Sequence, residues 1–364
     1  MVVAGTPKST ACTPPTRHLG VSVRSRAHTL PVTCAHLPSP PSSSASVVSL
    51  SHTQSATPVR HFDKHLTGKK RIYFLDVNPL CFNGSRPCMK SFAYWVGLFF
   101  SKVSHRDPVI AASVLDGEGG NEFRRHLLPS YKAGRQSNNG SSDGWLSRVE
   151  PQIVQILQSC NVPVVKIKGF EADDVVATLM DQALEYGYPV MIGSPDKDFK
   201  QLISNNVQIA MPVPELRRWC FYNMQHYIKQ YGCDPTSDLS LRCFMGDEVD
   251  GVPGLQKLVP SFGRKTAIKL LKKHGSLENL LNAAAVRIVG RDYAQDALTK
   301  YADYLRRNYQ VLSLRRDASI QLEENWLCER DSSNDSLVLS KFVQKLSQGR
   351  DVVRRSGQRV KSTA

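Results

Sequence analysis

The chain has 364 residues, of which 41% are hydrophobic, enough to form the core of one large or two small domains. No apolar run approaches the roughly 20 residues of a membrane-spanning helix, and nine scattered cysteines without a C-x-x-C pair indicate neither a zinc site nor a disulfide scaffold. The formal net charge of +15 fits a polyanionic partner such as nucleic acid, although a basic surface also serves solubility alone.

The first 62 residues have the composition of an organellar transit peptide. They contain five basic residues, no acid before Asp63, and many Ser, Thr, Pro and Ala residues. They lack the continuous apolar core of a secretory signal, and a disordered extension is the alternative. We therefore expect import into an organelle, the chloroplast first, with the mitochondrion or both organelles as alternatives.

From Lys69 onward, strand-like apolar runs alternate with helix-like periodicity. Strands separated by helices predict an α/β fold with a parallel sheet flanked by helices, whose ligand site lies beyond the carboxyl ends of the strands. A polar, glycine-rich stretch at 117–144 interrupts the pattern, and a Lys-rich helical segment runs from 238 to about 281. The expected strands are 71–76, 108–116, 162–167 and 189–193, and the expected helices are 89–103, 145–160 and 172–186.

Nine acidic residues punctuate this pattern at or near the ends of the apolar segments. Like charges that converge within a few ångström repel each other, so such a cluster is stable in ionised form only with cations. Oxygen ligands without nearby His or Cys favour Mg²⁺ or Mn²⁺ over zinc, which predicts a two-ion site that hydrolyses phosphodiester bonds. The acids at 171–174, taken alone, are better explained as a helix N-cap, but caps do not explain the acids at 196, 198, 247 and 250 as well. The nine acids are Asp76, Asp116, Glu171, Asp173, Asp174, Asp196, Asp198, Asp247 and Asp250.

Four segments resemble the successive motifs of the 5′-nuclease family, in the family's order. They are 131–135 (YKAGR), 170–175 (FEADDV), 194–198 (SPDKD) and 246–254 (GDEVDGVPG). This family includes the 5′→3′ exonuclease domain of bacterial DNA polymerase I and the flap endonucleases. The similarity covers about residues 71–317, with no polymerase portion after it. The chain therefore resembles a free-standing, plant-type organellar member of the family, which implies a PIN-like, Rossmann-like sheet.

The resemblance implies roles for the acids and for two basic residues. Asp76, Asp116, Glu171 and Asp173 would hold one metal ion, with Asp174 adjacent, and Asp196, Asp198, Asp247 and Asp250 would hold or support the other. Lys132 and Arg135 match basic residues that reach the scissile phosphate, where a cation neutralises developing charge. A solvated loop is the alternative for these two residues.

The segment 261–275 is similar to the family's helix-hairpin-helix-like element, which holds duplex DNA and often a monovalent cation such as K⁺. A glycine turn before a helix exposes backbone amides that grip phosphates without reading sequence. An ordinary amphipathic surface helix is the alternative. The implied DNA-binding residues are Gly254, Gly263, Arg264, Lys265, Thr266, Lys269, Lys272 and Lys273.

Two positions depart from the family pattern. Asn83 stands where the family usually has an Arg that holds substrate near the metals, and Arg86 is a candidate substitute. The segment 255–262 is longer than the usual hairpin, and Ser261 stands where a Gly is common. These departures affect the expected efficiency or terminus recognition, the monovalent ion and the grip on duplex.

The sequence thus predicts a metal-dependent, structure-selective 5′→3′ exonuclease and flap endonuclease, acting as a monomer on DNA with 5′ ends, flaps or nicks in an organelle. RNA primer removal, replication or repair would use this activity, and RNA–DNA hybrids are further candidate substrates. An RNase of the related PIN-like fold and a non-catalytic DNA-binding module are the alternatives. The expected organisation is a transit peptide at 1–62, a catalytic domain at 69–214, a helical DNA-binding subdomain at 215–325 and a largely disordered basic tail at 326–364.

Overall fold

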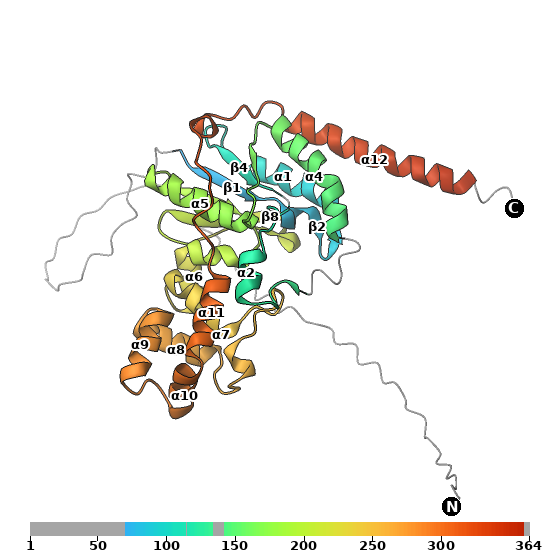
Figure 1. Cartoon of the computed structure of the whole chain (residues 1–364). Helices are drawn as coiled ribbons and strands as arrows, with labels where there is room; N and C mark the ends of the chain where they lie inside the picture. The colour runs from blue at the N-terminus through green and yellow to red at the C-terminus, as the bar shows by residue number, and fades with distance from the viewer. Residues whose placement is uncertain (1–69, 114, 134–141, 360–364) are drawn as a thin grey trace, which may run out of the picture. The chain divides into compact units, whose positions relative to one another are not determined.

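The structure, a computed structural model, describes residues 70–113, 115–133 and 142–359 (Figure 1). The expected transit peptide at 1–62 lies outside these residues, as does Arg135. Within the described ranges, no helix combines the length and the apolar composition needed to cross a membrane.

A six-stranded sheet of order β5-β4-β1-β6-β7-β8 forms the centre of the catalytic region. All neighbouring strands are parallel except β7 and β8, which pair antiparallel. The predicted parallel α/β fold is therefore confirmed. The strands are β1 Ile72–Asp76, β4 Val109–Ala112, β5 Val164–Val165, β6 Val190–Gly193, β7 Val207–Val213 and β8 Arg218–Tyr222, and a separate hairpin joins β2 Phe82–Asn83 to β3 Arg86–Pro87.

Strand β1 explains why a continuous apolar run marks a central strand. Alternate side chains of a strand point to opposite faces, and a parallel sheet buries both faces. Tyr73 and Leu75 face one hydrophobic core, whereas Ile72 and Phe74 face the other. Asp76 is the last residue of this strand, so its carboxylate lies at the edge of the sheet where the parallel strands end.

Helices cover both faces of the sheet, and a third core holds the helical subdomain together. Helices α1, α4 and α12 line the first core, α5 lines the second, and α7 to α11 build the third. The helices are α1 Met89–Phe100, α2 Glu122–Leu127, α4 Ser142–Ser159, α5 Ala172–Glu185, α6 Met224–Tyr231, α7 Asp238–Met245, α8 Arg264–His274, α9 Leu277–Val286, α10 Asp292–Lys300, α11 Ala302–Leu312 and α12 Asp335–Arg359; short 3-10 turns include η2 Asn78–Cys81, η3 Lys197–Leu202 and η6 Leu255–Lys257.

The domain boundary expected at 214 falls inside the sheet. Strands β7 and β8, which the sequence pattern did not predict, pair from Ile209–Tyr222 to Val213–Arg218. The segment after α11 also returns to the sheet, because Leu314, Ala318 and Leu322 pack in the second core. The sheet region is therefore built from two separated parts of the chain.

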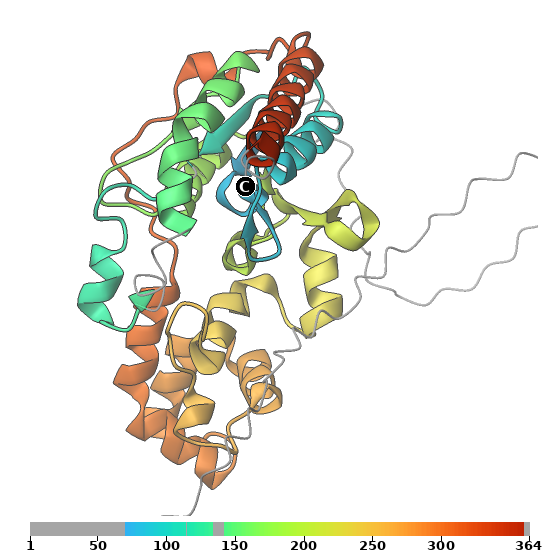
Figure 2. The same ribbon diagram turned by 90° about the vertical axis from the view of Figure 1, so that its right-hand side faces the viewer.

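The expectation of a largely disordered tail is wrong for α12. Its residues Leu339 and Phe342 are buried in the first core, and α12 lies beside α1 and α4 (Figures 1 and 2). Apolar residues spaced for one helical face drive this packing, although many charges between them hide the period. The start of α12 is fixed by a buried ion pair between Arg330 and Asp335, 2.7 Å apart.

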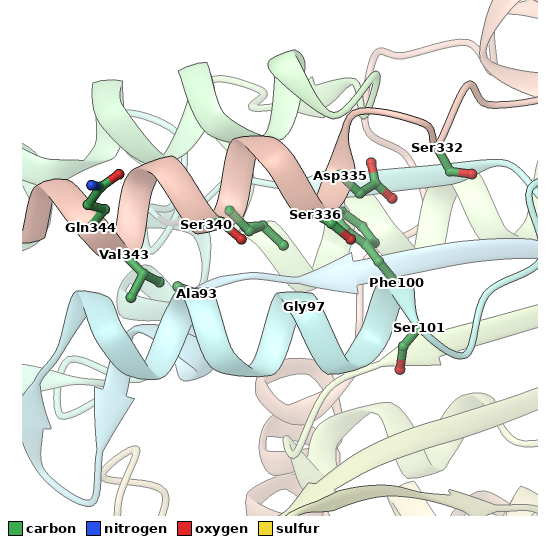
Figure 3. A pocket seen from close by; sticks show the side chains of 11 residues that line it. Ala93, Gly97, Phe100, Ser101, Ser332, Asp335, Ser336, Ser340, Val343 and Gln344 are labelled. Carbon is green, nitrogen blue, oxygen red and sulfur yellow. The ribbon is translucent and has the colours of Figure 1, made fainter.

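A groove of about 650 Å³ runs between α1 and α12 (Figure 3). Small residues such as Gly97 and Ser340 line it together with Phe100. Its one carboxylate is Asp335, which already pairs with Arg330. None of the predicted acids lines this groove, so it is separate from the candidate active site.

Candidate active site

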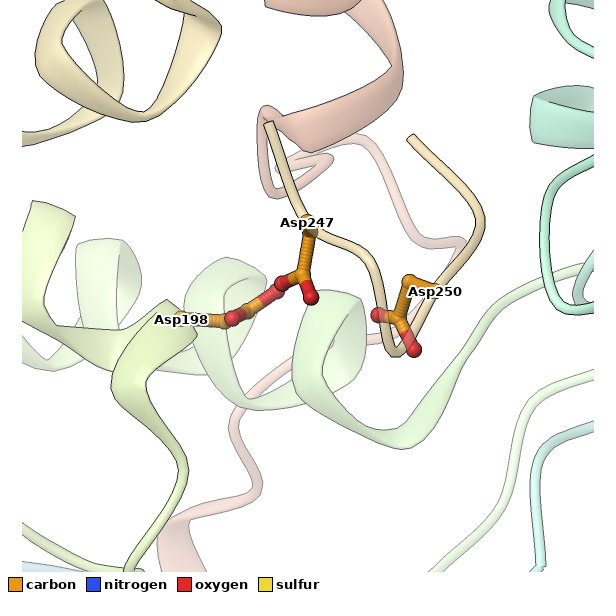
Figure 4. A group of neighbouring side chains, drawn as sticks. All are labelled: Asp198, Asp247 and Asp250. Carbon is orange, nitrogen blue, oxygen red and sulfur yellow. The ribbon is translucent and has the colours of Figure 1, made fainter. Parts of the chain in front are cut away.

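Three predicted acids meet closely enough to hold one cation. The carboxylates of Asp198, Asp247 and Asp250 each offer an oxygen, and these oxygens lie within 4.8 Å of one another (Figure 4). Asp198 comes from η3, just after β6, whereas Asp247 and Asp250 come from the loop after α7. The three residues, called the acid trio below, thus join the sheet to the helical subdomain.

The glycines of the motif at 246–254 shape the loop that carries two of these acids. Asp247 and Val252 exchange two backbone hydrogen bonds of 2.7 and 2.8 Å, which close the loop. Gly251 has φ +72°, and a Cβ there would lie 2.2 Å from the Ser130 carbonyl oxygen. A side chain at this position therefore has no room, and the glycine permits the close approach of two loops.

Two basic side chains reach the acid trio from the protein itself. Arg242 donates to Asp198 at 2.6 Å and to Asp247 at 3.3 Å, and Lys197 pairs with Asp247 at 2.8 Å. Desolvation raises the pKa of Asp247, but Lys197 and Arg242 outweigh it and hold that pKa below its ordinary value. Asp247 is therefore suited to the ionised form that binds a cation.

The donor set of the trio fits a hard divalent cation. Oδ1 of Asp247 is buried without a hydrogen-bond partner, which is costly unless a cation or water satisfies it. All three residues supply carboxylate oxygens, the ligands that Mg²⁺ and Mn²⁺ prefer. Among the residues that the structure describes, Asp198, Asp247 and Asp250 thus form a group able to hold a metal ion.

A second group of acids gathers at the ends of β1 and β4. The Ser194 hydroxyl donates to Asp76 at 2.7 Å, and Asp116 accepts from the backbone N–H of Ala172 at 3.0 Å. Burial raises the pKa of Asp76 to about 6, and the nearby charge of Asp116 adds to the increase. A carboxyl group whose ionised form is disfavoured in this way is stabilised when a cation binds beside it.

Glu171 is the most heavily partnered acid of the second group. It is buried, pairs with Nζ of Lys132, accepts from the Tyr131 hydroxyl at 3.2 Å and lies 3.2 Å from Arg124. Desolvation raises its pKa, and the two basic residues counteract that effect. The Lys132 ammonium therefore stands inside the acidic site.

Lys132 links the two groups of acids. Its backbone N–H donates to the Asp250 carbonyl at 2.8 Å, while its side chain pairs with Glu171. Desolvation lowers the pKa of Lys132, but Glu171, Asp173, Asp116 and Asp250 together raise it above the ordinary value. Lys132 also has φ 49°, a conformation that costs energy for a non-glycine residue and is typical of functional sites.

The adjacent residues Asp173 and Asp174 differ in their surroundings. Asp173 has a pKa raised well above its ordinary value by desolvation and by Glu171 and Asp174. Asp174 is fully buried and accepts two hydrogen bonds from Arg124, at 2.7 and 2.8 Å, and one from the backbone N–H of Arg315 at 2.8 Å. Both oxygens of Asp174 are thus engaged within the protein, and its predicted role beside a metal ion stays a prediction.

Asp196 is not a member of the acid trio. Its Oδ1 caps η3 by accepting from the backbone N–H of Asp198 at 2.9 Å. Desolvation and the Asp198 carboxylate raise the pKa of Asp196 to about 7, even though the residue as a whole is exposed. The two aspartates therefore differ in their surroundings: Asp198 belongs to the acid trio, whereas Asp196 caps η3 near solvent, and a metal role for either residue stays a prediction.

The predicted DNA-binding lysines share one side of α8. Lys265, Lys269, Lys272 and Lys273 line an open depression of about 540 Å³ together with Ile268. This arrangement agrees with their spacing in the sequence, whereas their contact with DNA stays a prediction.

Other residues predicted for this element have partners in the protein. The Arg264 guanidinium lies 4.7 Å from the centre of the Tyr231 ring, and the Thr266 hydroxyl lies 3.1 Å from that of Tyr293. A Cβ at Gly254 would lie 2.1 Å from the Met245 carbonyl oxygen, so this glycine serves loop packing. Gly263 is the N-cap of α8 and has open space beside it.

The two departures from the family pattern have a structural setting. Asn83 and Arg86 are directly opposite each other in the β2–β3 hairpin, so the two positions are neighbours in space. Phe262, at the end of the longer segment 255–262, is buried and stacks on Phe244 at 5.1 Å. The extra length therefore contributes to the core of the helical subdomain.

Sequence reasoning missed the buried cations and the hydroxyl group that organise the acids. Arg124, Arg242 and Ser194 each contact predicted acids, but they stand outside the acidic motifs or carry no charge. Arg124 is 2% exposed, a burial that is rare for Arg without a paired carboxylate. The number of acids was the available signal, because buried carboxylates require counter-charges.

Comparisons with known proteins agree with this architecture. Residues 71–232 match the family model "5′-3′ exonuclease, N-terminal resolvase-like domain", and residues 234–335 match "5′-3′ exonuclease, C-terminal SAM fold". A 5′-3′ exonuclease of Aquifex aeolicus is 28% identical over 285 residues, which cover 78% of this chain and 90% of that protein. DNA polymerase I of Chloroflexus aurantiacus is 30% identical over 264 residues, 72% of this chain and 26% of the polymerase.

The solved structure of 5′-exonuclease from bacteriophage T5 with zinc has the same fold, with a TM-score of 0.53 and 20% identity over 77% of this chain and 99% of that one. The chain spans only 24% of DNA polymerase I from Bacillus caldotenax, to which it is 28% identical over 220 residues. The two family models follow each other over the sheet and the helical subdomain, and the acid trio takes Asp198 from the first matched range and Asp247 and Asp250 from the second. The chain therefore belongs to the 5′-3′ exonuclease family, the 5′ nucleases.

Proposed function

We propose that this protein is a metal-dependent, structure-selective 5′→3′ exonuclease and flap endonuclease that hydrolyses phosphodiester bonds of DNA. The observation that carries the proposal is the place of Lys132 between the two groups of acids: its side chain pairs with Glu171, and its backbone N–H donates to the backbone carbonyl of Asp250. Family membership supports it, since the matching relatives include a 5′-3′ exonuclease and DNA polymerases I.

The acid trio would hold one divalent ion, and Asp76, Asp116, Glu171 and Asp173 would hold a second. Mg²⁺ is proposed for both, with Mn²⁺ able to substitute, because all the donors are carboxylate oxygens. When bound, such ions supply an activated water and stabilise the leaving oxygen. The related T5 5′-exonuclease is described with bound divalent zinc ions.

The chain's own residues prepare this chemistry. Lys132 keeps its proton, because the surrounding carboxylates raise its pKa, and it can donate a hydrogen bond to a phosphate oxygen. Arg242 and Lys197 orient Asp198 and Asp247. Arg135 is proposed to assist Lys132 at the phosphate, on the resemblance alone.

DNA with 5′ ends, flaps or nicks is the proposed substrate, with RNA–DNA hybrids as a further one, and the protein is proposed to act as a monomer. The lysines of α8 would grip the duplex phosphates, and a monovalent cation such as K⁺ would bind the hairpin that precedes this helix. The basic charge of the chain supports this proposal.

A cleavage assay tests the proposed activity. We expect 5′-end-labelled flap and nicked duplexes to be cut in Mg²⁺ faster than blunt duplex or single strands, and Asp173→Asn to slow cleavage about a thousandfold or more by displacing a ligand. Asp181→Asn, on the outer part of the same helix, is the matched control and should cut normally. Cleavage of single-stranded RNA alone would support the RNase alternative, and binding without cleavage would support the DNA-binding module.

The proposed location is an organelle, the chloroplast first, with the mitochondrion or both as alternatives. RNA primer removal, replication or repair would be the use of the enzyme there. The support is the Ser-rich composition of residues 1–62, which contain no acid. A fusion of these residues to a fluorescent protein should enter plastids or mitochondria, and a diffuse cytosolic signal would contradict the proposal.

A further inference from the structure

Tyr231 lies at the junction of the sheet region and the helical subdomain. It is the last residue of α6, and it packs against both the second and the third hydrophobic core. The Tyr227 ring supports it at a centroid distance of 4.5 Å. Tyr231 is therefore fixed between the two parts of the chain that carry the acids and the α8 lysines.

Two cations contact this ring from different elements. Nζ of Lys200 donates to the Tyr231 hydroxyl at 2.9 Å and lies 5.2 Å from the ring centre. The Arg264 guanidinium lies 4.7 Å from the same centre. Lys200 also lies 5.3 Å from the Tyr222 ring. Contacts with aromatic rings hold long basic side chains in place without neutralising their charge.

A third cation lies beside the next residue. A Cβ added at Gly232 would be 3.1 Å from Nζ of Lys272, so the Lys272 ammonium lies close to the backbone here. Lys200, Arg264 and Lys272 together are called the tyrosine-side cations below. In the part of the chain that the structure describes, none of the three has a carboxylate within 4.0 Å, and all can therefore meet an external anion.

A buried carboxylate lies behind this group. Asp238 accepts from the Tyr227 hydroxyl at 2.8 Å, is 4% exposed, and has a second oxygen without a hydrogen-bond partner. Its charge interacts favourably with Lys200. Asp238 therefore favours a cation at the position of Lys200 without forming an ion pair with it.

The tyrosine-side cations connect the two functional elements. Lys200 belongs to η3, two residues after Asp198 of the acid trio. Arg264 is the first residue of α8, and Lys272 also lines the lysine depression of that helix. A DNA strand that runs from α8 toward the acid trio would bring its phosphates close to the tyrosine-side cations.

We propose that Tyr231 is a positioning residue that holds Lys200 and Arg264, next to Lys272, as a phosphate-binding site between α8 and the acid trio. The proposal deepens the proposed nuclease function and rests on it. Lys200 and Tyr231 stand outside the motifs that indicated the DNA-binding element, and only the folded chain brings them to Arg264.

Salt titrations of binding to a fluorescent 5′-flap duplex, in Ca²⁺ to suppress cutting, test this site directly. The double change Lys200→Ala with Arg264→Ala should lower the slope of log affinity against log salt by about 0.9 for each lost phosphate contact. In Mg²⁺, KM should rise far more than kcat falls. The exposed Lys229→Ala on α6 removes an equal charge nearby and is the matched control, with an unchanged slope.

Tyr231→Leu separates positioning from charge, because it removes no charge. It should lower the salt slope as well, while Tyr231→Phe, which keeps the ring, should retain most of it. Wild-type binding with an unchanged slope in the Lys200 and Arg264 double variant would overturn the inference and leave the nuclease function standing. Failure of the wild-type protein to bind or cut any DNA would instead overturn the proposed function.

Discussion

Changing each of two neighbouring aspartates to Asn should affect different properties, the stability of the fold in one case and cleavage in the other. Asp174 neutralises buried Arg124 through two hydrogen bonds and also accepts from the Arg315 backbone. Asp173 accepts a hydrogen bond from the backbone N–H of Asp174 at 2.8 Å and carries a raised pKa, caused by desolvation and by neighbouring carboxylates. We expect Asp174→Asn to lower stability and Asp173→Asn to abolish cleavage without lowering stability.

The magnitude for Asp174→Asn follows from the burial of Arg124, which is 2% exposed. Removing one partner of a buried ion pair costs about 3–5 kcal/mol, because a buried charge is left uncompensated. Glu171, 3.2 Å from Arg124, retains part of the compensation, so the lower end of about 3 kcal/mol applies. With a few degrees per kcal/mol for a chain of this size, the melting temperature should fall on the order of 10 °C.

The assay is thermal and urea unfolding in EDTA, paired with flap cleavage in Mg²⁺. Asp173→Asn should unfold at or slightly above the wild-type temperature, since it removes a partly buried carboxylate whose charge the metal-free fold disfavours. Asp181→Asn, whose partner Arg316 is half exposed, should change stability by less than about 1 kcal/mol. Wild-type stability of Asp174→Asn together with a loss of metal binding would refute the structural role assigned to this residue.

Three further measurements address other parts of the structure. Desolvation raises the folded-state pKa of Asp76 to about 6 and that of Asp196 to about 7, both above the ordinary value of 3.8. Between about pH 4 and pH 7 the folded protein therefore binds more protons than the unfolded chain, so its stability in EDTA should fall as the pH rises. Mg²⁺ should reverse this loss of stability. A melting temperature that rises over this window in EDTA would contradict the assignment. Gly251→Ala should lower the free energy of unfolding by about 3 kcal/mol and disrupt the acid trio, because its Cβ would lie 2.2 Å from a carbonyl oxygen. The control Gly84→Ala, at φ +60° with open space around it, should lower it by about 1 kcal/mol; urea unfolding measures both. Phe342→Ala should lower the free energy of unfolding by about 3–5 kcal/mol if α12 is docked, and no change would show that it is not.

The sequence alone determined the parallel α/β fold, the family and the set of acids. Continuous apolar runs such as 72–75 are typical of strands buried on both faces, and a carboxylate at the end of each run reaches the same edge. These patterns are local, so they can be read without knowing the rest of the chain. The closely spaced glycines and acids of 246–254 are likewise local, because the loop closes on itself through Asp247 and Val252.

Only the tertiary structure shows which partners each acid has. Asp173 and Asp174 are neighbours in sequence and equal in chemistry, but Arg124, 50 residues from Asp174, engages only the second one directly. The same holds for α12, whose apolar face became recognisable only against the core it covers. It also holds for Tyr231 of α6, which contacts Lys200 of η3 and Arg264 of α8. Counter-charges, burial and stacking depend on contacts between distant segments, and a local sequence pattern does not contain them.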